Sequence, residues 1–353
     1  MSIGIDFGYS SVKIVQLEKR SDKYVLQKVG IKSVVDDLNK YDPEKISKSQ
    51  WTAAVMDLCK EMKINPKKMK KAVSSISGTN ISAKQITTLE MSDEELVASL
   101  EFEAKKHIPL DGTEAVLDYH ILGYHPTELD KINVLLLSTT KNIINNHAEI
   151  IKNAGFKGGI FDADPVAIVN TYLANHEKPE EGVDVILNIG NMSSSLIVWG
   201  KNHQFFNREL SYGGHHFTKA TMKTHQVDYN SAEGIKIKEG VESCSEVSND
   251  DSDSAFSIQV ADKTIYSKLI DEIRKTLRYY IKTNNQAFFK KFYLSGGSAN
   301  LIGLKEMIHE NLNVEIEIID PFTNMENNED NENPAQYVIA TGLAIRGLEM
   351  GKK

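Results

Sequence analysis

Two short turns rich in glycine and serine carry the residue types that could hold a nucleotide phosphate. The first follows an apolar strand and runs from Asp6 through Gly8, Ser10 and Ser11 to Lys13. Backbone N–H groups and hydroxyls in such a turn can point at an anion, and Lys13 adds a positive charge. Asp6 ends the strand and is suited to hold Mg²⁺ through water, because that ion binds few protein carboxylates directly. Taken alone, this pattern is more typical of an ordinary hairpin.

The same pattern recurs about 180 residues later in the chain. An apolar strand from Val183 reaches Asn188, and Gly190, Ser193 and a second apolar strand follow. Each copy has a small polar acid or amide, a glycine two residues later, hydroxyls and then an apolar strand. Two such hairpins predict a duplicated β-β-β-α-β-α unit, with a cleft between its halves in which both turns face one ligand.

Three further segments fit the same cleft. Gly213 and Gly214 open a helix whose bare N-terminal backbone suits phosphate or ribose oxygens. Glu233 and Lys236 lie one helical turn apart and could clamp ribose hydroxyls and a phosphate, although an exposed ion pair is the alternative. The glycine pair in residues 292–301 permits the close approach of a purine or its ribose, although a plain β-α turn explains it too.

The residues expected to contact nucleotide and metal therefore come from all these segments. The nucleotide set is Gly8, Tyr9, Ser10, Ser11, Lys13, Gly190, Asn191, Met192, Ser193, Gly213, Gly214, Glu233, Lys236, Gly296, Gly297 and Ser298. The metal set is Asp6 and Asn188, holding Mg²⁺ through water.

Hydrophobic periodicity predicts the elements that must position these turns. The first unit has strands at 3–7, 12–18, 24–31 and 72–76 and a helix at 47–62. An α-β-β-α insert then runs from a capping box at Ser92 to a helix ending before Gly155. His107 and His147 lie on its helical stripes, where packed histidines are expected rather than ligands. The first unit resumes with a strand at 158–162 and a helix at 165–174, and small residues at 340–344 predict close helix packing.

Composition excludes several classes of protein. A formal charge of −8 over 353 residues argues against nucleic acid as the main partner, and the segments 242–253 and 326–332 predict solvated acidic loops. The basic stretch 60–71 is better explained as a solvated helix end than as a lipid contact. Cys59 and Cys244 lack metal-ligand spacing, and neither a signal peptide nor an apolar run long enough to span a bilayer is visible. We therefore expect a cytoplasmic protein.

The ordered set of segments resembles the actin-like ATPase superfamily and, within it, the PilM family of type IV pilus assembly proteins. The resemblance covers nearly the whole chain, and the ordered set is more specific than any single motif. The motifs are GIDFGYSSVK (4–13), RELSYGG (208–214), EIRKTLRYY (272–280), LSGGSANL (294–301) and DPF (320–322), with EFEAKKHIP (101–109) and NAGF (153–156) in the insert.

The resemblance implies an α/β, actin-like (ribonuclease H-like) fold of two duplicated lobes with an inserted subdomain of the FtsA and PilM type. The implied divisions are a first-lobe core at 1–78, the insert at 79–157, a return at 158–181, a second-lobe core at 182–212 and 261–338, its small subdomain at 213–260, and a C-terminal helix at 339–353.

The resemblance also implies a function: binding of ATP and Mg²⁺ between the lobes and of the cytoplasmic N-terminal peptide of the membrane protein PilN near the insert. The protein would then join other pilus components at the inner face of the cytoplasmic membrane only through its partner. The sequence leaves homo-oligomerisation open.

Two positions depart from the superfamily pattern. Asn188 stands where the superfamily carries Asp, and an amide lacks the charge that stabilises Mg²⁺. Asp164 stands where related ATPases use Glu or Gln to orient the attacking water, and its side chain is one methylene shorter than Glu. Asp164 before Pro165 also predicts a helix N-cap, which is the favoured role. We therefore expect ATP hydrolysis to be slow or absent.

Two alternatives from other functional classes remain. A small-molecule kinase of the same superfamily would need an acceptor pocket with a positioned carboxylate base, and the sequence offers none beyond Asp164. A filament-forming cytoskeletal protein would need self-complementary apolar surfaces at the lobe tips, for which the acidic segment 242–254 is poorly suited.

Overall fold

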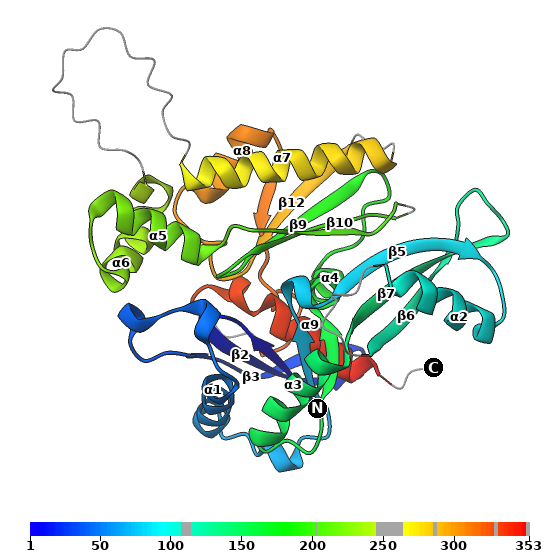
Figure 1. Ribbon diagram of the computed structural model, residues 1–353, viewed down its shortest axis with the longest axis horizontal. Coiled ribbons are helices and arrows are strands. Elements are labelled where there is room, and N and C mark those ends of the chain that lie inside the picture. The colour runs from blue at the N-terminus through cyan, green and yellow to red at the C-terminus, as the bar shows by residue number, and fades with distance from the viewer. Residues whose placement is uncertain (107–113, 202, 245–263, 285–287, 328–330, 351–353) are drawn as a thin grey trace, which may run out of the picture.

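The computed structural model describes residues 1–106, 114–201, 203–244, 264–284, 288–327 and 331–350. Two lobes face each other, with the second lobe at the top of Figure 1, the first at the bottom and the insert at the right. His107 and parts of the acidic segments 242–253 and 326–332 lie outside the described residues.

The first lobe is built on a five-stranded sheet of order β3-β2-β1-β4-β8. Its three N-terminal strands are antiparallel, whereas β4 and β8 run parallel to β1. Every residue of β1 is buried, because helices cover both faces: α1 and α3 pack on one side, and α4 and α9 on the other. The elements are β1 (Ser2–Phe7), β2 (Ser11–Arg20), β3 (Lys23–Ser33), α1 (Lys48–Glu61), β4 (Ala72–Ile76), α3 (Lys141–Asn153), β8 (Ile160–Ala163), α4 (Asp164–Asn175) and α9 (Val338–Glu349).

The second lobe repeats this plan with a sheet of order β11-β10-β9-β12-β13. Its first three strands are again antiparallel, and β12 and β13 again run parallel to the first strand of the set. The predicted duplication is therefore confirmed. The elements are β9 (Val183–Ile189), β10 (Ser194–Trp199), β11 (Phe206–Leu210), α5 (Gly214–His225), α6 (Tyr229–Glu239), η5 (Gly240–Cys244), α7 (Ile265–Asn284), β12 (Phe289–Ser295), α8 (Leu304–Leu312) and β13 (Ile316–Ile318).

The insert differs from its prediction in one element. Its sheet has three strands in the order β5-β7-β6, formed by β5 (Ser82–Leu89), β6 (Ala115–Tyr124) and β7 (Lys131–Thr140), with α2 (Asp93–Ala104) packed on β7. The sequence predicted α-β-β-α and missed β5, because most side chains of this edge strand are partly or fully exposed and give no apolar run. The last helix, α3, packs against α1 of the first lobe.

Helix α9 packs on the first-lobe sheet and on α4, in close contact with their backbones. A Cβ added at Gly342 would lie 1.8 Å from the carbonyl oxygen of Ala167, and one added at Gly4 would lie 1.9 Å from that of Ala340. The small residues at 340–344 therefore serve close packing, as predicted.

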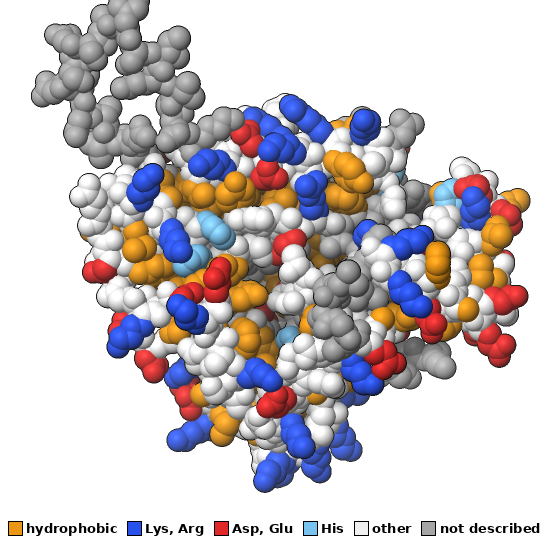
Figure 2. All heavy atoms as spheres, viewed as in Figure 1, with side chains coloured by type: hydrophobic (Ala, Val, Ile, Leu, Met, Phe, Trp, Pro, Cys, Tyr) orange, Lys and Arg blue, Asp and Glu red, His pale blue; other side chains and the backbone are white. Residues whose placement is uncertain are grey.

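Short 3-10 helices fill the connections, and none of them changes the order of the layers. They are η1 (Leu38–Lys40), η2 (Pro43–Lys45), η3 (Pro66–Lys68), η4 (Gly78–Asn80) and η6 (Pro334–Tyr337). Lysines gather at the bottom of the view in Figure 2, where Figure 1 places the chain between α1 and β4, and those at 60, 63, 67, 68 and 70 are exposed. No helix in the described part of the chain is both long and apolar enough to cross a bilayer.

Candidate functional site

A cavity of about 820 Å³ lies between the lobes, and both predicted phosphate turns open into it. This volume is in the range of pockets that hold small-molecule ligands. The predicted residues that line it are Asp6, Gly8, Tyr9, Ser10, Ser11, Lys13, Asp164, Asn188, Gly190, Asn191, Met192, Ser193, Gly214, Glu233, Lys236, Gly296, Gly297 and Ser298. Six separate segments of the sequence thus converge on one space.

Gly213 is the predicted residue that is absent from this lining, and it has a structural role instead. A Cβ at this position would lie 2.6 Å from the carbonyl oxygen of Asn191, so only glycine lets α5 approach the second turn. The backbone N–H groups of Gly214 and His215 donate to the carbonyls of Gly190 and Asn191 at 2.9 and 2.8 Å. The start of α5 is therefore bound to the turn, with Gly214 facing the cavity.

The strand registers make the two turns directly comparable. In the first lobe Asp6 pairs with Lys13, which pairs with Ile31 on the third strand. In the second lobe Asn188 pairs with Ser195, which pairs with Glu209 on the third strand. These two rows, Asp6–Lys13–Ile31 and Asn188–Ser195–Glu209, occupy equivalent positions, and all their members line the cavity. The second row contains no lysine or arginine. Its acidic residue, Glu209, lies on the third strand, whereas Asp6 lies on the first strand of its row.

The first turn contains a paired acid and base. The ammonium of Lys13 lies 3.5 Å from the carboxylate of Asp6, and both side chains are largely buried. Burial raises the pKa of Asp6, and attraction to Lys13 opposes this rise. The turn is braced within its own lobe, because the indole N–H of Trp51 donates to the carbonyl of Gly8 at 3.0 Å.

The second turn holds its polar groups differently. Asn188 accepts a hydrogen bond from the hydroxyl of Ser295 at 3.2 Å, and the hydroxyl of Ser193 donates to the carboxylate of Glu209. Burial raises the pKa of Glu209, while hydrogen bonds from Ser193 and Ser195 oppose the rise. Gly296, which follows β12, packs against the residue that precedes the second turn. It has a φ of +92°, and a Cβ there would clash with the backbone of Ile189.

Glu233 and Lys236 form a partly buried network and not the exposed pair that was the alternative. Lys236 is only 6% exposed, and its ammonium lies 2.7 and 2.8 Å from the two carboxylate oxygens of Glu233. Thr218 joins them, since its hydroxyl lies 2.9 Å from the ammonium of Lys236 and donates to Glu233 at 2.5 Å. Helices α5 and α6 thereby hold both charged groups at the cavity wall.

The prediction that Asp164 caps a helix is wrong. Ala163 occupies the N-cap of α4, and Asp164 and Pro165 are the first two residues of the helix. One oxygen of Asp164 is buried without a hydrogen-bond partner among the described residues. Burial raises the pKa of Asp164 well above its usual value, and the nearby charge of Asp6 raises it further, against a hydrogen bond from Ser75. Asp164 thus lines the cavity with a carboxyl group whose protonated form is favoured.

An aromatic contact across the lobes was not predicted from the sequence. Tyr41, between η1 and η2 of the first lobe, donates its hydroxyl to Asn191 of the second turn. Its ring centroid lies 5.4 Å from that of Tyr229 and 5.5 Å from that of His215. The carboxamide oxygen of Asn39 also accepts from the backbone N–H of Asn230 at 3.0 Å. We call Asn39 and Tyr41 with these partners the clasp.

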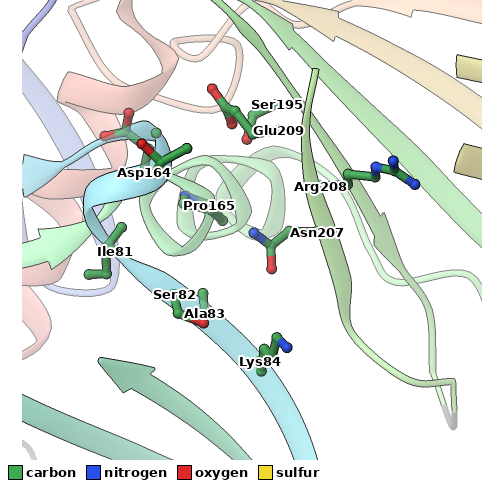
Figure 3. Close-up of a pocket in the computed structure, with 12 residues that line it drawn as sticks. Ile81, Ser82, Ala83, Lys84, Asp164, Pro165, Ser195, Asn207, Arg208 and Glu209 are labelled. Carbon is green, nitrogen blue, oxygen red and sulfur yellow. The ribbon is translucent and has the colours of Figure 1, made fainter. Parts of the chain in front are cut away.

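Glu209 was also missed, except as part of the motif at 208–214. It borders a smaller pocket of about 210 Å³ that shares Gly78, Thr79, Asp164, Ser195 and Glu209 with the larger cavity. Figure 3 shows Asp164, Ser195 and Glu209 at one end of this pocket and Lys84 at the other, with the Arg208 side chain extending away. The sequence repeat does not point to Glu209, because the equivalent residue of the first lobe is the apolar Ile31. This equivalence becomes visible only from the strand registers.

A family model described as type IV pilus assembly protein PilM matches residues 4–348. Among solved structures, a PilM–PilN type IV pilus biogenesis complex aligns with a TM-score of 0.79 and 21% identity, covering 99% of this chain and 98% of that chain. The ethanolamine utilization protein EutJ from Carboxydothermus hydrogenoformans aligns with a TM-score of 0.54 and 13% identity, covering 98% and 89%. The structural neighbours show that the fold is actin-like, and the family match shows that this chain belongs to the PilM family of type IV pilus assembly proteins.

Proposed function

We propose that this chain binds ATP with Mg²⁺ in the interlobe cavity and acts as a nucleotide-responsive component of a type IV pilus assembly complex. One observation carries the proposal: two hairpin turns with equivalent registers, one from each of two similarly ordered sheets, open into the same cavity. Such a cavity between duplicated lobes suits a ligand with several anionic groups, because both turns offer backbone N–H groups and hydroxyls.

The wall of the cavity suggests how the nucleotide lies. The two turns and Lys13 would take the phosphates. The start of α5 is not the bare N-terminus that the sequence predicted, because its first N–H groups already donate to protein carbonyls; it would instead hold the second turn in place. The pair Glu233 and Lys236 would contact the ribose, and the glycines at 296 and 297 would allow the base to approach the backbone. In this proposed order the terminal phosphate would lie nearest Asp164 and Glu209.

The residues fit Mg²⁺ held mainly by phosphates and water. Within the described ranges no cluster of three or more His, Cys, Asp and Glu side chains could hold a metal. Asp6 and Asn188 end equivalent strands and both line the cavity, so each could bind a metal-coordinated water. The ion would supply positive charge against the phosphates.

We also propose that hydrolysis is slow or absent. A side chain that accepts a proton from an attacking water must be ionised, and burial together with the charge of Asp6 favours the protonated form of Asp164. Rapid Mg²⁺-dependent phosphate release that is lost in Asp164→Ala would contradict this.

A matched pair of glycine variants tests nucleotide binding. A Cβ added at Gly297 or at Gly234 would meet no atom within 4 Å, but only Gly297 lines the cavity. We expect Gly297→Val to abolish binding of ATP·Mg²⁺ in isothermal titration calorimetry while the protein stays folded, and Gly234→Val to bind like the wild type. If the wild type binds no nucleotide, or if Gly297→Val binds as well as the wild type, the proposal fails.

The same proposal includes the partner. A relative of this fold was solved as a PilM–PilN complex, and the insert carries exposed apolar side chains that a peptide could cover. Orange side chains lie along the right edge of Figure 2, over the insert. The exposed members are Leu89, Phe102, Val116, Ile121, Tyr124 and Leu129. We propose that the cytoplasmic N-terminal peptide of a PilN protein binds here and brings the chain to the membrane.

Fluorescence polarisation with a labelled PilN N-terminal peptide tests the partner. We expect Phe102→Ala to weaken peptide binding and Ile302→Ala, at another exposed apolar position on the second lobe, to leave it unchanged. The affinity should also differ between nucleotide-free and ATP-loaded protein. An identical affinity in both states excludes coupling, because a ligand shifts only an equilibrium whose states it binds differently.

A further inference from the structure

The acidic side chains that line the cavity outnumber its lysines. Lys13 pairs with Asp6 at 3.5 Å, and Lys236 pairs with Glu233 at 2.7 Å. Asp164 and Glu209 line the same cavity, and neither forms an ion pair with a described residue. The end of the cavity near the smaller pocket therefore holds two carboxyl groups without a cation beside them.

Glu209 is connected to the second phosphate turn through Ser193. A serine hydroxyl has a single proton, and here Ser193 donates it to Glu209. A phosphate oxygen that accepts a hydrogen bond from Ser193 must take this proton from the carboxylate. Since hydrogen bonds to a hydroxyl are about 2.7 Å long, such an oxygen would lie within about 5 Å of Glu209.

Repulsion between these two anions is substantial. At about 5 Å in a partly buried site, a pair of like unit charges changes an equilibrium constant by about tenfold or more. Other charged or titratable groups near Glu209 include Asp164 on α4, Tyr9 in the first turn, and Asp6 with its partner Lys13; Lys84 on β5 lies at the far end of the smaller pocket. None of these places a cation in contact with Glu209.

We propose that Glu209 is the specificity-determining residue of the second phosphate turn: it disfavours a bare triphosphate and makes nucleotide binding depend on a divalent cation. The equivalent position in the first lobe is Ile31 on β3, which carries no charge. The dependence therefore arises in the second lobe. This inference rests on the proposed binding of nucleotide and names a determinant within the same site.

The test measures ATP and ADP affinity with Mg²⁺ and with EDTA, in wild type and in Glu209→Gln. The glutamine keeps the size of the side chain and can still accept from Ser193. We expect wild-type affinity for ATP to fall by much more than tenfold in EDTA, and Glu209→Gln to recover about tenfold of that loss. The recovery should be larger for ATP than for ADP, because the third phosphate brings more charge near Glu209.

Three further variants keep the test decisive. Glu209→Asp retains the charge, so its nucleotide binding should still depend on the metal. Glu209→Ile introduces the residue found at the equivalent position of the first lobe, and its nucleotide binding should depend less on the metal. Glu306→Gln removes an exposed charge on α8 and should behave like the wild type. Circular dichroism melting curves identify any variant that is unfolded.

The outcomes separate this inference from the proposed function. A wild type that binds neither ATP nor ADP in Mg²⁺ overturns the proposed function itself. A wild type that binds nucleotide, with the same loss of affinity in EDTA for Glu209→Gln as for wild type, overturns only the role of Glu209. The same is true if Glu209→Gln weakens binding equally with and without the metal.

Discussion

The two phosphate turns have the same register and strand order, but their charged side chains are arranged differently. In the first, an acid and a base face each other on neighbouring strands, Asp6 and Lys13. In the second, the equivalent residues are the neutral Asn188 and Ser195, and the acid is on the third strand as Glu209. Duplication thus preserved the backbone geometry, while the charges diverged.

The turns also differ in what holds them. Trp51 of the same lobe donates to the carbonyl of Gly8 in the first turn. The second turn is likewise held within its own lobe, by the N–H groups of Gly214 and His215, and Asn191 additionally accepts the hydroxyl of Tyr41 from the opposite lobe. Among these bonds only the one from Tyr41 crosses between the lobes, so lobe closure acts directly on the second turn. This difference suits a protein that reports its nucleotide state by lobe position.

The largest expected effect comes from removing the cation of the first turn. Lys13→Ser copies the second turn and leaves Asp6 buried without its partner, so we expect nucleotide affinity in Mg²⁺ to fall about 100-fold. Ser195→Ala, at the equivalent position, removes only a neutral hydroxyl and should cost less than about tenfold. Isothermal titration calorimetry measures both. Equal losses would mean that the two turns do not differ in charge as the structure indicates.

The clasp should produce the next largest effect. Tyr41→Ala removes the ring packed on Tyr229 and His215 and the hydroxyl bound to Asn191, so we expect nucleotide to dissociate about tenfold faster. Tyr41→Phe keeps the ring and should lie between this variant and the wild type. Stopped-flow release of a fluorescent ATP analogue measures the rates.

Trp51→Phe provides the comparison, since it removes a bond to the first turn within one lobe. Double electron–electron resonance between spin labels on the two lobes should show a wider distance distribution for Tyr41→Ala and an unchanged one for Trp51→Phe. If both variants widen the distribution, the second turn is no more sensitive to lobe closure than the first.

Much of the fold could be predicted from the sequence, because the strands before both turns are rich in apolar residues and the turns carry glycine. The burial of β1 and β9 on both faces leaves a clear apolar signal. By contrast, β5 was missed because it lies at the edge of a small sheet with few buried side chains. Packing at 340–344 was predictable since only small residues allow such close helix contact.

The site was predictable where local chemistry defined it and unpredictable where distant strands meet. Gly8, Lys13 and Glu233 stand in local patterns that suggest their roles. Glu209 and Tyr41 do not, because each depends on a long-range partner: a strand register in one case and the opposite lobe in the other. The error at Asp164 has the same origin, since a local N-cap pattern was overridden by its position at the cavity.

A smaller effect is expected when Asn188 is replaced by Asp, the residue at the equivalent position of the first lobe. Asn188→Asp places a carboxylate beside the proposed metal, so the Mg²⁺ concentration that half-saturates nucleotide binding should fall about five- to tenfold. Without metal the same variant should bind ATP more weakly than the wild type, because it adds repulsion. Asn188→Ala removes the contact with Ser295 and should not lower the Mg²⁺ requirement. A lower requirement in both variants would show that charge is not the cause.

The smallest expected effect concerns stability and pH. The folded-state pKa of Glu209 is raised above its usual value of 4.5, so folding favours its protonated form. Any stability this gives is complete below about pH 4.5 and is lost as the pH rises through the folded pKa. Glu209→Gln cannot lose a proton there, so its melting temperature should rise relative to the wild type between about pH 4.5 and 7, by about 2 °C.

Differential scanning fluorimetry across this range measures the difference, with Glu306→Gln as the exposed control. A relative fall of the Glu209→Gln curve with rising pH would mean that the folded protein stabilises the ionised carboxylate. The hydroxyls of Ser193 and Ser195 would then outweigh its burial. In that case the second turn would neutralise its acid with hydrogen bonds as effectively as the first does with Lys13, and the electrostatic difference between the lobes would disappear.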